Sequence, residues 1–200
     1  MSVVAGPLAD YDLVVVDVET TGWLPAEAAI TEIGAVRLNG GEVTGEFSSL
    51  VRAYSPIPAE ICELTGITDA MVSRAPSIYA AMTAFLAFAK DCVLVAHNAP
   101  FDLGFLTAAC AAAGVRWPPT AVIDTAVLAR MLLGPQDVPD CKLATLSWYF
   151  RTPTTPCHRA LADAKATVSV LAGLLEVAAG GRLPVRRPAA ADQTVLGIAS

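Results

Sequence analysis

The alternation of apolar and polar residues in the first half of the chain predicts three successive strands. A β-branched run at 12–17 is typical of a strand buried in the centre of a sheet. Residues 29–38 predict a second strand and residues 42–51 a third, with the turn signal Asn39-Gly40-Gly41 between them. We therefore expect these three strands to form an antiparallel meander.

The second half of the chain alternates short apolar runs with longer segments of helical periodicity. We expect helices near 58–64, 68–72 and 77–90, a strand at 93–96, a helix at 99–113, a strand at 120–124, and helices at 125–133, 142–149 and 159–178. Asn98 is the expected N-cap of the helix at 99–113, and Gly114 should end it. This order predicts an α/β fold with a mixed five-stranded sheet flanked by helices.

Length and composition indicate one compact domain. The chain has 200 residues, of which 54% are hydrophobic and 16% charged. We expect an N-terminal extension at 1–10, the domain at 11–180, and a tail or linker at 181–200, where Pro and Ala follow without core periodicity. No apolar stretch reaches the ~18 residues of a membrane span, and no secretory signal opens the chain, so we expect a cytoplasmic protein.

Five widely spaced cysteines include no Cys-x-x-Cys pair, which excludes a zinc knuckle and a redox motif. We expect buried, reduced thiols. The net charge of −6 argues against binding a nucleic acid through a general positive field. Weak binding to long duplexes, with local capture of an end, is the expectation.

Four acidic residues and one histidine lie in three short segments. Asp17 and Glu19 lie within 14–22, and their spacing of two puts both carboxylates on one face of a strand. At ~4 Å separation and an effective dielectric constant of ~20, such a like-charge pair costs about 4 kcal/mol. A divalent cation removes this cost. For this pair considered alone, a solvated strand end is the alternative.

The other two segments favour a shared site. Asp102 falls in the first turn of a helix that follows a buried strand, at the sheet edge where α/β sites gather. Asp163 lies in an alanine-rich helix that could approach the sheet closely. Five helical residues turn through about 500°, so His158 converges with Asp163 only from the loop ahead of the helix, as Pro153 and Pro156 favour. An imidazole on a loop suits a general base whose loop moves.

Four carboxylates fit two Mg²⁺ or Mn²⁺ ions about 3.5–4 Å apart, which clamp the attacking and leaving oxygens of an in-line displacement. We assign Asp17 as the bridging ligand, with Glu19 and Asp163 completing one ion. Asp102 would hold the second ion, directly or through water. The sequence thus predicts a metal-dependent hydrolase that acts on a phosphodiester.

These motifs resemble the DEDDh class of 3′-to-5′ exonucleases, the DnaQ-like group that includes the proofreading (epsilon) subunit of bacterial DNA polymerase III. His158 sets the subclass. The similarity runs from about residue 11 to 178 and includes residues 30–36, 57–68, 123–130 and 142–146. It implies a ribonuclease H-like fold and the release of nucleoside 5′-monophosphates from 3′ ends of mostly single-stranded DNA. A polymerase or repair assembly is the implied partner.

The resemblance also implies which residues meet the terminal nucleotides of the substrate, with Glu19 near the 3′-hydroxyl. The backbone around Thr20, Thr21 and Gly22 should meet the terminal nucleotide, and Leu64, Thr65 and Phe101 should pack against the last bases. Base stacking of this kind contributes ~1–3 kcal/mol per base, although ordinary core packing is the alternative for Leu64 and Phe101. Two other functions stay open: an RNA-trimming exoribonuclease similar to RNase T or oligoribonuclease, because motifs do not reveal contacts to the 2′-hydroxyl, and a catalytically idle interaction module.

Overall fold

A computed structural model describes residue 8 and residues 10–118 and 120–181. Most of the predicted N-terminal extension, and the predicted tail from residue 182 onward, lie outside the described residues. Among the helices of the described part, none is both long and apolar enough to cross a membrane.

A five-stranded sheet forms the centre of the domain, in the order β3-β2-β1-β4-β5. The strands are β1 (Leu13–Thr20), β2 (Ile30–Asn39), β3 (Glu42–Leu50), β4 (Val93–Ala96) and β5 (Val122–Asp124). β2 is antiparallel to both β1 and β3, whereas β4 is parallel to β1 and to β5. The predicted meander and the predicted mixed sheet are both confirmed.

Seven helices occur in the described residues, each within two residues of its predicted range. They are α1 (Ala59–Thr65), α2 (Asp69–Val72), α3 (Ile78–Phe88), α4 (Ala99–Ala113), α5 (Thr125–Leu132), α6 (Leu143–Phe150) and α7 (Ala160–Ala178). The first strand differs more from its prediction, because pairing with β2 continues as far as Thr20. Asp17 and Glu19 therefore lie inside β1 and not beyond its end.

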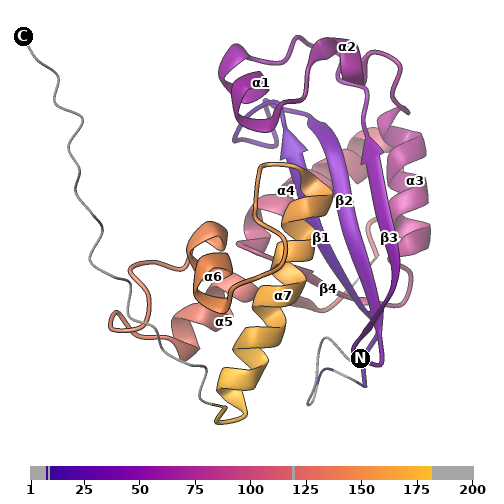
Figure 1. Ribbon diagram of the computed structural model, residues 1–200. Helices are drawn as coiled ribbons and strands as arrows, with labels where there is room; N and C mark the ends of the chain where they lie inside the picture. Colours follow the sequence, from indigo (N-terminus) through magenta and orange to yellow (C-terminus); the bar gives the residue numbers. More distant parts are fainter. Residues whose placement is uncertain (1–7, 9, 119, 182–200) are drawn as a thin grey trace, which may run out of the picture.

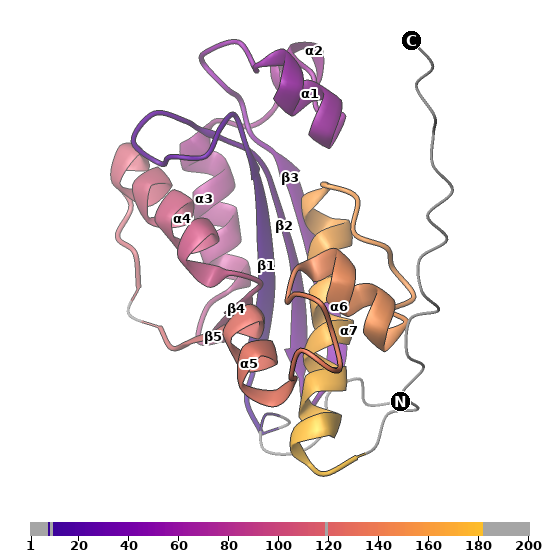
Figure 2. The same cartoon turned by 90° about the vertical axis from the view of Figure 1, so that its left-hand side faces the viewer.

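The sheet lies between two layers of helices (Figures 1 and 2). Figure 2 shows α3 and α4 on one side of the sheet and α6 and α7 on the other. Alternation along β1 divides the core in the same way: Val14 and Val16 pack with the α3–α4 layer, and Leu13 and Val15 pack with α7. Helices α1 and α2 lie beyond the end of the sheet at which β1 terminates (Figure 1).

Helix α7 approaches the sheet so closely that a side chain on Gly34 of β2 has no room. A Cβ atom there would lie 2.1 Å from the backbone nitrogen of Leu161 and 2.2 Å from the carbonyl carbon of Ala160. Ala160 and Ala164 are themselves fully buried. The small residues expected to allow a close approach therefore do so, and the first turn of α7 packs on β2 almost backbone to backbone.

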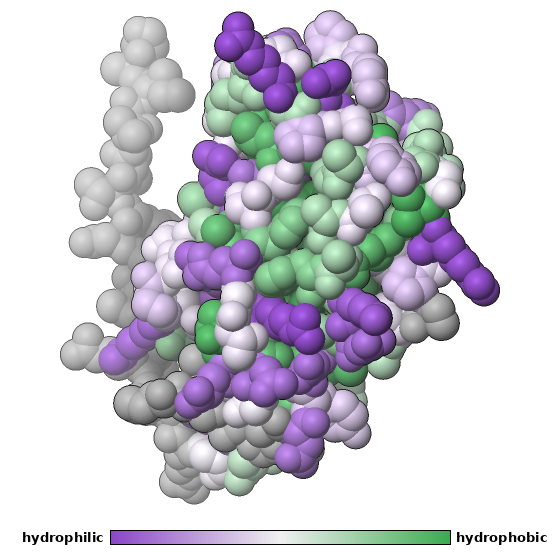
Figure 3. All heavy atoms as spheres, turned by 90° about the vertical axis from the view of Figure 1, so that its right-hand side faces the viewer, coloured by the Kyte–Doolittle hydropathy of each residue, from purple (hydrophilic) through white to green (hydrophobic). Residues whose placement is uncertain are grey.

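The edge strand β3 and helix α3 form the face that Figure 3 turns toward the reader. Hydrophobic residues cross the middle of this face, with strongly hydrophilic residues above and below them. Phe47 of β3 is half-buried, and its ring centroid lies 6.0 Å from that of Phe85 and 5.7 Å from that of Phe88. An aromatic cluster thus joins the edge strand to α3.

The prediction that the cysteines are buried is confirmed only in part. Cys92 and Cys110 are buried, as expected, and all five thiols are free. Cys157 is exposed, so the prediction is wrong for this residue. It lies in the exposed loop ahead of α7.

Candidate active site

The carboxylates of Asp17 and Glu19 continue the face of β1 that packs against α7. Glu19 is buried, with 8% of its surface exposed, and Asp17 is half-buried. Both side chains line one hollow of about 200 Å³ at the end of the sheet. The expectation that a spacing of two gathers them on one face is confirmed.

Asp102 reaches the same hollow from the first turn of α4. β4 pairs with β1 only from Leu13 to Val15, so the later backbone N–H of Val18 donates instead to Asp102 Oδ1, at 3.1 Å. One carboxylate oxygen is thereby fixed to the strand that carries Asp17, and the buried side chain is held at the site.

The start of α4 is not capped as predicted. Asn98 adopts a left-handed conformation, with φ 62°, and makes no capping hydrogen bond through its side chain. Instead, the carboxylate of Asp124 accepts hydrogen bonds from the backbone N–H groups of Asn98 and Ala99, each at 3.1 Å. The same carboxylate caps α5 through Ala126 and Val127. The predicted role of Asn98 is therefore wrong, because an acceptor from β5 takes its place.

His158 and Asp163 meet across the start of α7. His158 lies in the loop before the helix, as the turn geometry of the sequence predicted, in a left-handed conformation with φ 55°. Asp163 Oδ1 accepts a hydrogen bond from the backbone N–H of Cys157 at 2.9 Å. This bond folds the loop back over the first turn, so the imidazole and the buried carboxylate both line the hollow.

Burial raises the pKa of all four carboxylates, and repulsion from neighbouring carboxylates adds to the effect for Asp17 and Glu19. Burial first, then the charges of Asp102, Asp163 and Glu19, raises the pKa of Asp17 well above its ordinary value. Burial and neighbouring carboxylates raise the pKa of Glu19 to about 8. Burial raises the pKa of Asp102 to about 8, against the opposing hydrogen bond from Val18. Burial also raises the pKa of Asp163.

The donor set suits divalent metal ions. Ligand atoms of Glu19, Asp163 and His158 lie within 4.8 Å of one another, close enough to share one ion. Asp17 and Asp102 line the same hollow. No lysine or arginine occurs among the described residues that line it. Carboxylate oxygens are the preferred ligands of Mg²⁺ and Mn²⁺, and such cations would relieve the repulsion that raises these pKa values.

Most residues expected to meet a substrate surround the carboxylates. The predicted residues that line the hollow are Thr20, Gly22, Leu64, Thr65 and Phe101. Thr21 is not among them, because its hydroxyl accepts from Ala29 N–H and its own N–H donates to the Ala29 carbonyl. Leu64 is 40% exposed, so it is not ordinary core.

Several residues of this region were not predicted from the sequence. His97 and Leu143 line the hollow, and His97 Nδ1 lies 2.9 Å from the Thr125 hydroxyl. Glu32 and Arg159 form an ion pair beside the cluster, at 2.7 Å. A signal for this pair existed, because an acidic residue occurs in a stretch of β2 that is otherwise uncharged.

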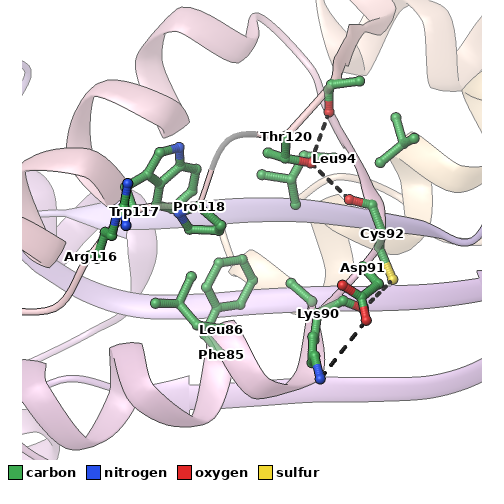
Figure 4. A pocket seen from close by; sticks show the side chains of 13 residues that line it. Phe85, Leu86, Lys90, Asp91, Cys92, Leu94, Arg116, Trp117, Pro118 and Thr120 are labelled. Carbon is green, nitrogen blue, oxygen red and sulfur yellow. Dashed lines mark hydrogen bonds and ion pairs between the residues drawn. The ribbon is translucent and has the colours of Figure 1, made fainter.

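A larger hollow of about 650 Å³ lies elsewhere, beside the start of β4 (Figure 4). Figure 4 shows Phe85 and Leu86 on one side, with Trp117 and Arg116 opposite and Lys90 and Asp91 nearby. Asp91, its one carboxylate, pairs weakly with Lys90 at 4.0 Å. We place the chemistry in the smaller hollow, because the carboxylates converge there.

A mixed α/β sheet with carboxylates from three distant segments gathered at one end is the arrangement expected of a metal-dependent phosphodiesterase. Comparison with known families makes the assignment specific. Residues 14–171 match the family model described as exonuclease (RNase_T). The chain belongs to this exonuclease family, and the resemblance to its DnaQ-like members is confirmed.

Two relatives illustrate the similarity. The chain is 49% identical over 176 residues to a protein of Mycobacterium tuberculosis (strain CDC 1551 / Oshkosh) named as a bifunctional exonuclease/endonuclease; the match covers 84% of this chain and 27% of that protein. It is 41% identical over 165 residues to a PolC-type DNA polymerase III of Caldanaerobacter subterraneus subsp. tengcongensis, covering 82% of this chain and 12% of the polymerase. The chain thus spans a small part of either relative.

Solved structures support the ribonuclease H-like fold. Exonuclease X in complex with 5′ overhanging duplex DNA superposes with a TM-score of 0.66 at 26% identity, covering 84% of this chain and 93% of that one. E. coli exonuclease I in complex with a dT13 oligonucleotide gives a TM-score of 0.72 at 18% identity, covering 83% of this chain and 41% of that one. At this low identity, the second likeness concerns the fold alone.

Proposed function

We propose that this domain hydrolyses phosphodiester bonds from the 3′ end of single-stranded DNA and releases nucleoside 5′-monophosphates. The observation that carries the proposal is the convergence of Asp17, Glu19, Asp102 and Asp163 with His158 in one hollow. Each of these carboxylates has a raised pKa. Buried acids so crowded have little structural value, whereas divalent cations use them all.

Two Mg²⁺ or Mn²⁺ ions are the proposed cofactors. Asp17 would bridge them, Glu19 and Asp163 would complete one ion, and Asp102 would hold the other, directly or through water. Asp102 keeps one oxygen for this purpose, since only Oδ1 accepts from Val18. The ions supply charge stabilisation for the attacking and leaving oxygens.

His158 is the proposed general base. Its ring lies within reach of the Glu19 and Asp163 carboxylates, and the residue is exposed to solvent. A proton taken from the attacking water could therefore leave through solvent. Because a ring nitrogen in this position could also bind a cation, metal affinity must be measured together with rate.

The surface around the carboxylates suits the end of a strand. Trp23 is 70% exposed, and its ring centroid lies 6.5 Å from that of Phe101. With Leu64 on α1, these side chains offer an apolar surface on which terminal bases could stack without sequence preference. The names of relatives support the setting: exonuclease X was solved with 5′ overhanging duplex DNA, and PolC-type relatives are polymerases. We propose a polymerase or repair assembly as the partner.

Digestion of end-labelled oligonucleotides tests the proposal. A 5′-labelled strand incubated with Mn²⁺ should shorten stepwise, whereas a 3′-labelled strand should release labelled mononucleotide at once; EDTA should stop both reactions. Parallel DNA and RNA strands decide the substrate class. Asp163→Asn should abolish release, and the matched control Asp91→Asn, at the exposed far end, should not. Internal cleavage, activity in EDTA, or full activity of Asp163→Asn would contradict the proposal.

A further inference from the structure

Glu32 is a fifth carboxylate beside the cluster and faces Glu19 across the β1–β2 pair. It is 2% exposed. Like charges directly opposite each other on neighbouring strands are destabilising, so a buried acid here requires compensation. None of the metal assignments above uses Glu32.

Arg159 supplies this compensation through a two-point contact. Its Nε donates to Glu32 Oε2 at 3.0 Å, and a terminal nitrogen donates to Oε1 at 2.7 Å. The backbone N–H of Ala160 also donates to Oε2, at 3.0 Å. Helix α7 has no side-chain cap of its own, so a carboxylate from β2 takes that place. The planar fork of arginine gives such a contact a fixed direction.

His158 lies between two anchored neighbours. On one side, the Cys157 N–H binds Asp163 Oδ1 at 2.9 Å; on the other, Arg159 binds Glu32. His158 itself has φ 55°, a conformation that costs a non-glycine residue free energy and persists only where its surroundings impose it. The two anchors impose it, and they leave the imidazole beside Glu19 and Asp163.

We infer that Arg159, held by Glu32, is a positioning residue for the reaction and acts through His158. Only the role of the imidazole as a general base rests on the proposed function. The geometric part is that the fork of Arg159 fixes the backbone that carries the ring. An arginine that merely stabilised the fold would leave the environment of His158 unchanged once the domain had folded.

Histidine NMR tests the geometric part without a nuclease assay. The chain has two histidines, His97 and His158, so each ring gives one readily assigned Cε1–H signal. In Arg159→Gln, the His158 signal should move to the position of a free histidine, while the His97 signal stays in place. Arg37→Gln is the matched control, because it breaks another arginine–carboxylate contact, with Asp12 at 3.0 Å. An unchanged His158 signal in folded Arg159→Gln would overturn the inference.

Kinetics test the catalytic part. Arg159→Gln should lower kcat on single-stranded DNA by ~10–100-fold, the usual effect of losing a group that orients a reacting residue, and change KM and Mn²⁺ affinity by less than about threefold. In a His158→Ala background the same substitution should cause no further loss, because both changes remove one contribution. The inference is overturned if the decreases in kcat caused by the two substitutions multiply in the double variant, or if Mn²⁺ affinity falls in parallel with kcat. Absence of nuclease activity in the wild type would refute the proposed function, and the NMR result would still decide the geometric part.

Discussion

The crowding of carboxylates at the end of β1 makes the stability of the metal-free domain depend on pH. Burial, then the charges of Asp163, Glu32 and Asp102, raises the pKa of Glu19 from 4.5 to about 8. The folded state therefore holds this proton more tightly than the unfolded chain does. It loses stability as pH rises from 4.5 toward 8. Above that range, the ionised carboxylate costs about 5 kcal/mol.

Glu19→Gln removes the charge and keeps the shape of the side chain. Because counter-ions and small movements relieve part of the repulsion, we expect the variant to gain ~2 kcal/mol at pH 8 in EDTA. For a domain of this size, that gain raises Tm by ~4–8 °C. Near pH 5 the two proteins should differ little. Thermal unfolding followed by circular dichroism at both pH values measures the effect, with Glu63→Gln, an exposed position on α1, as the matched control.

Saturating Mn²⁺ should reverse the order of thermal stability of the wild type and Glu19→Gln. A ligand that binds the folded state at a hundredfold excess over Kd adds ~3 kcal/mol of stability, and the variant lacks one carboxylate ligand. The wild type should then unfold at the higher temperature. The reasoning is refuted if, in EDTA at pH 8, Glu19→Gln is less stable than the wild type or changes no more than Glu63→Gln does.

Three further substitutions test other features. Gly34→Ala should lower the free energy of urea unfolding by at least ~3 kcal/mol, because its Cβ would meet the backbone of α7. Gly45→Ala is the control and should lose far less, since its Cβ would lie 3.3 Å from a ring atom of Phe88. Asp124→Ala should lose ~2–3 kcal/mol in the same assay, since it uncaps α4 and α5 together; equal stability would contradict the double cap. His158→Ala should lower kcat by ~10²–10⁴-fold with calorimetric Mn²⁺ affinity unchanged, and a parallel loss of affinity would instead make the residue a ligand.

Elements and ligands whose positions depend on local periodicity could be predicted from the sequence. The spacing of two placed Asp17 and Glu19 on one face, and the angle turned by a helix placed His158 in the loop before α7. Both arguments need only the geometry of a single element. The positions of Asp102 and Asp163 relative to Asp17 and Glu19 depend on more than one element. They could still be predicted, because successive α/β units bring the ends of their strands to the same edge of the sheet.

Contacts between distant segments could not be predicted in this way. Asn98 has the right residue type for an N-cap, but Asp124, 26 residues later, provides the acceptor. The pairing of Glu32 with Arg159 joins residues 127 apart. Residue type shows what a side chain can bind, whereas the partner depends on the tertiary fold.

The backbone-to-backbone packing of α7 on β2 at Gly34 has a consequence for the evolution of this domain. Where side chains separate two elements, exchanging large and small residues can shift one relative to the other. No such exchange is open here, because nothing but hydrogen fits between Gly34 and the first turn of α7, which contains Asp163. The distance between the start of α7, which carries that carboxylate, and β2 is therefore set by the backbone itself. Adaptation to new substrates should accumulate instead around α1 and the loop after β1, where Leu64 and Trp23 have room to vary.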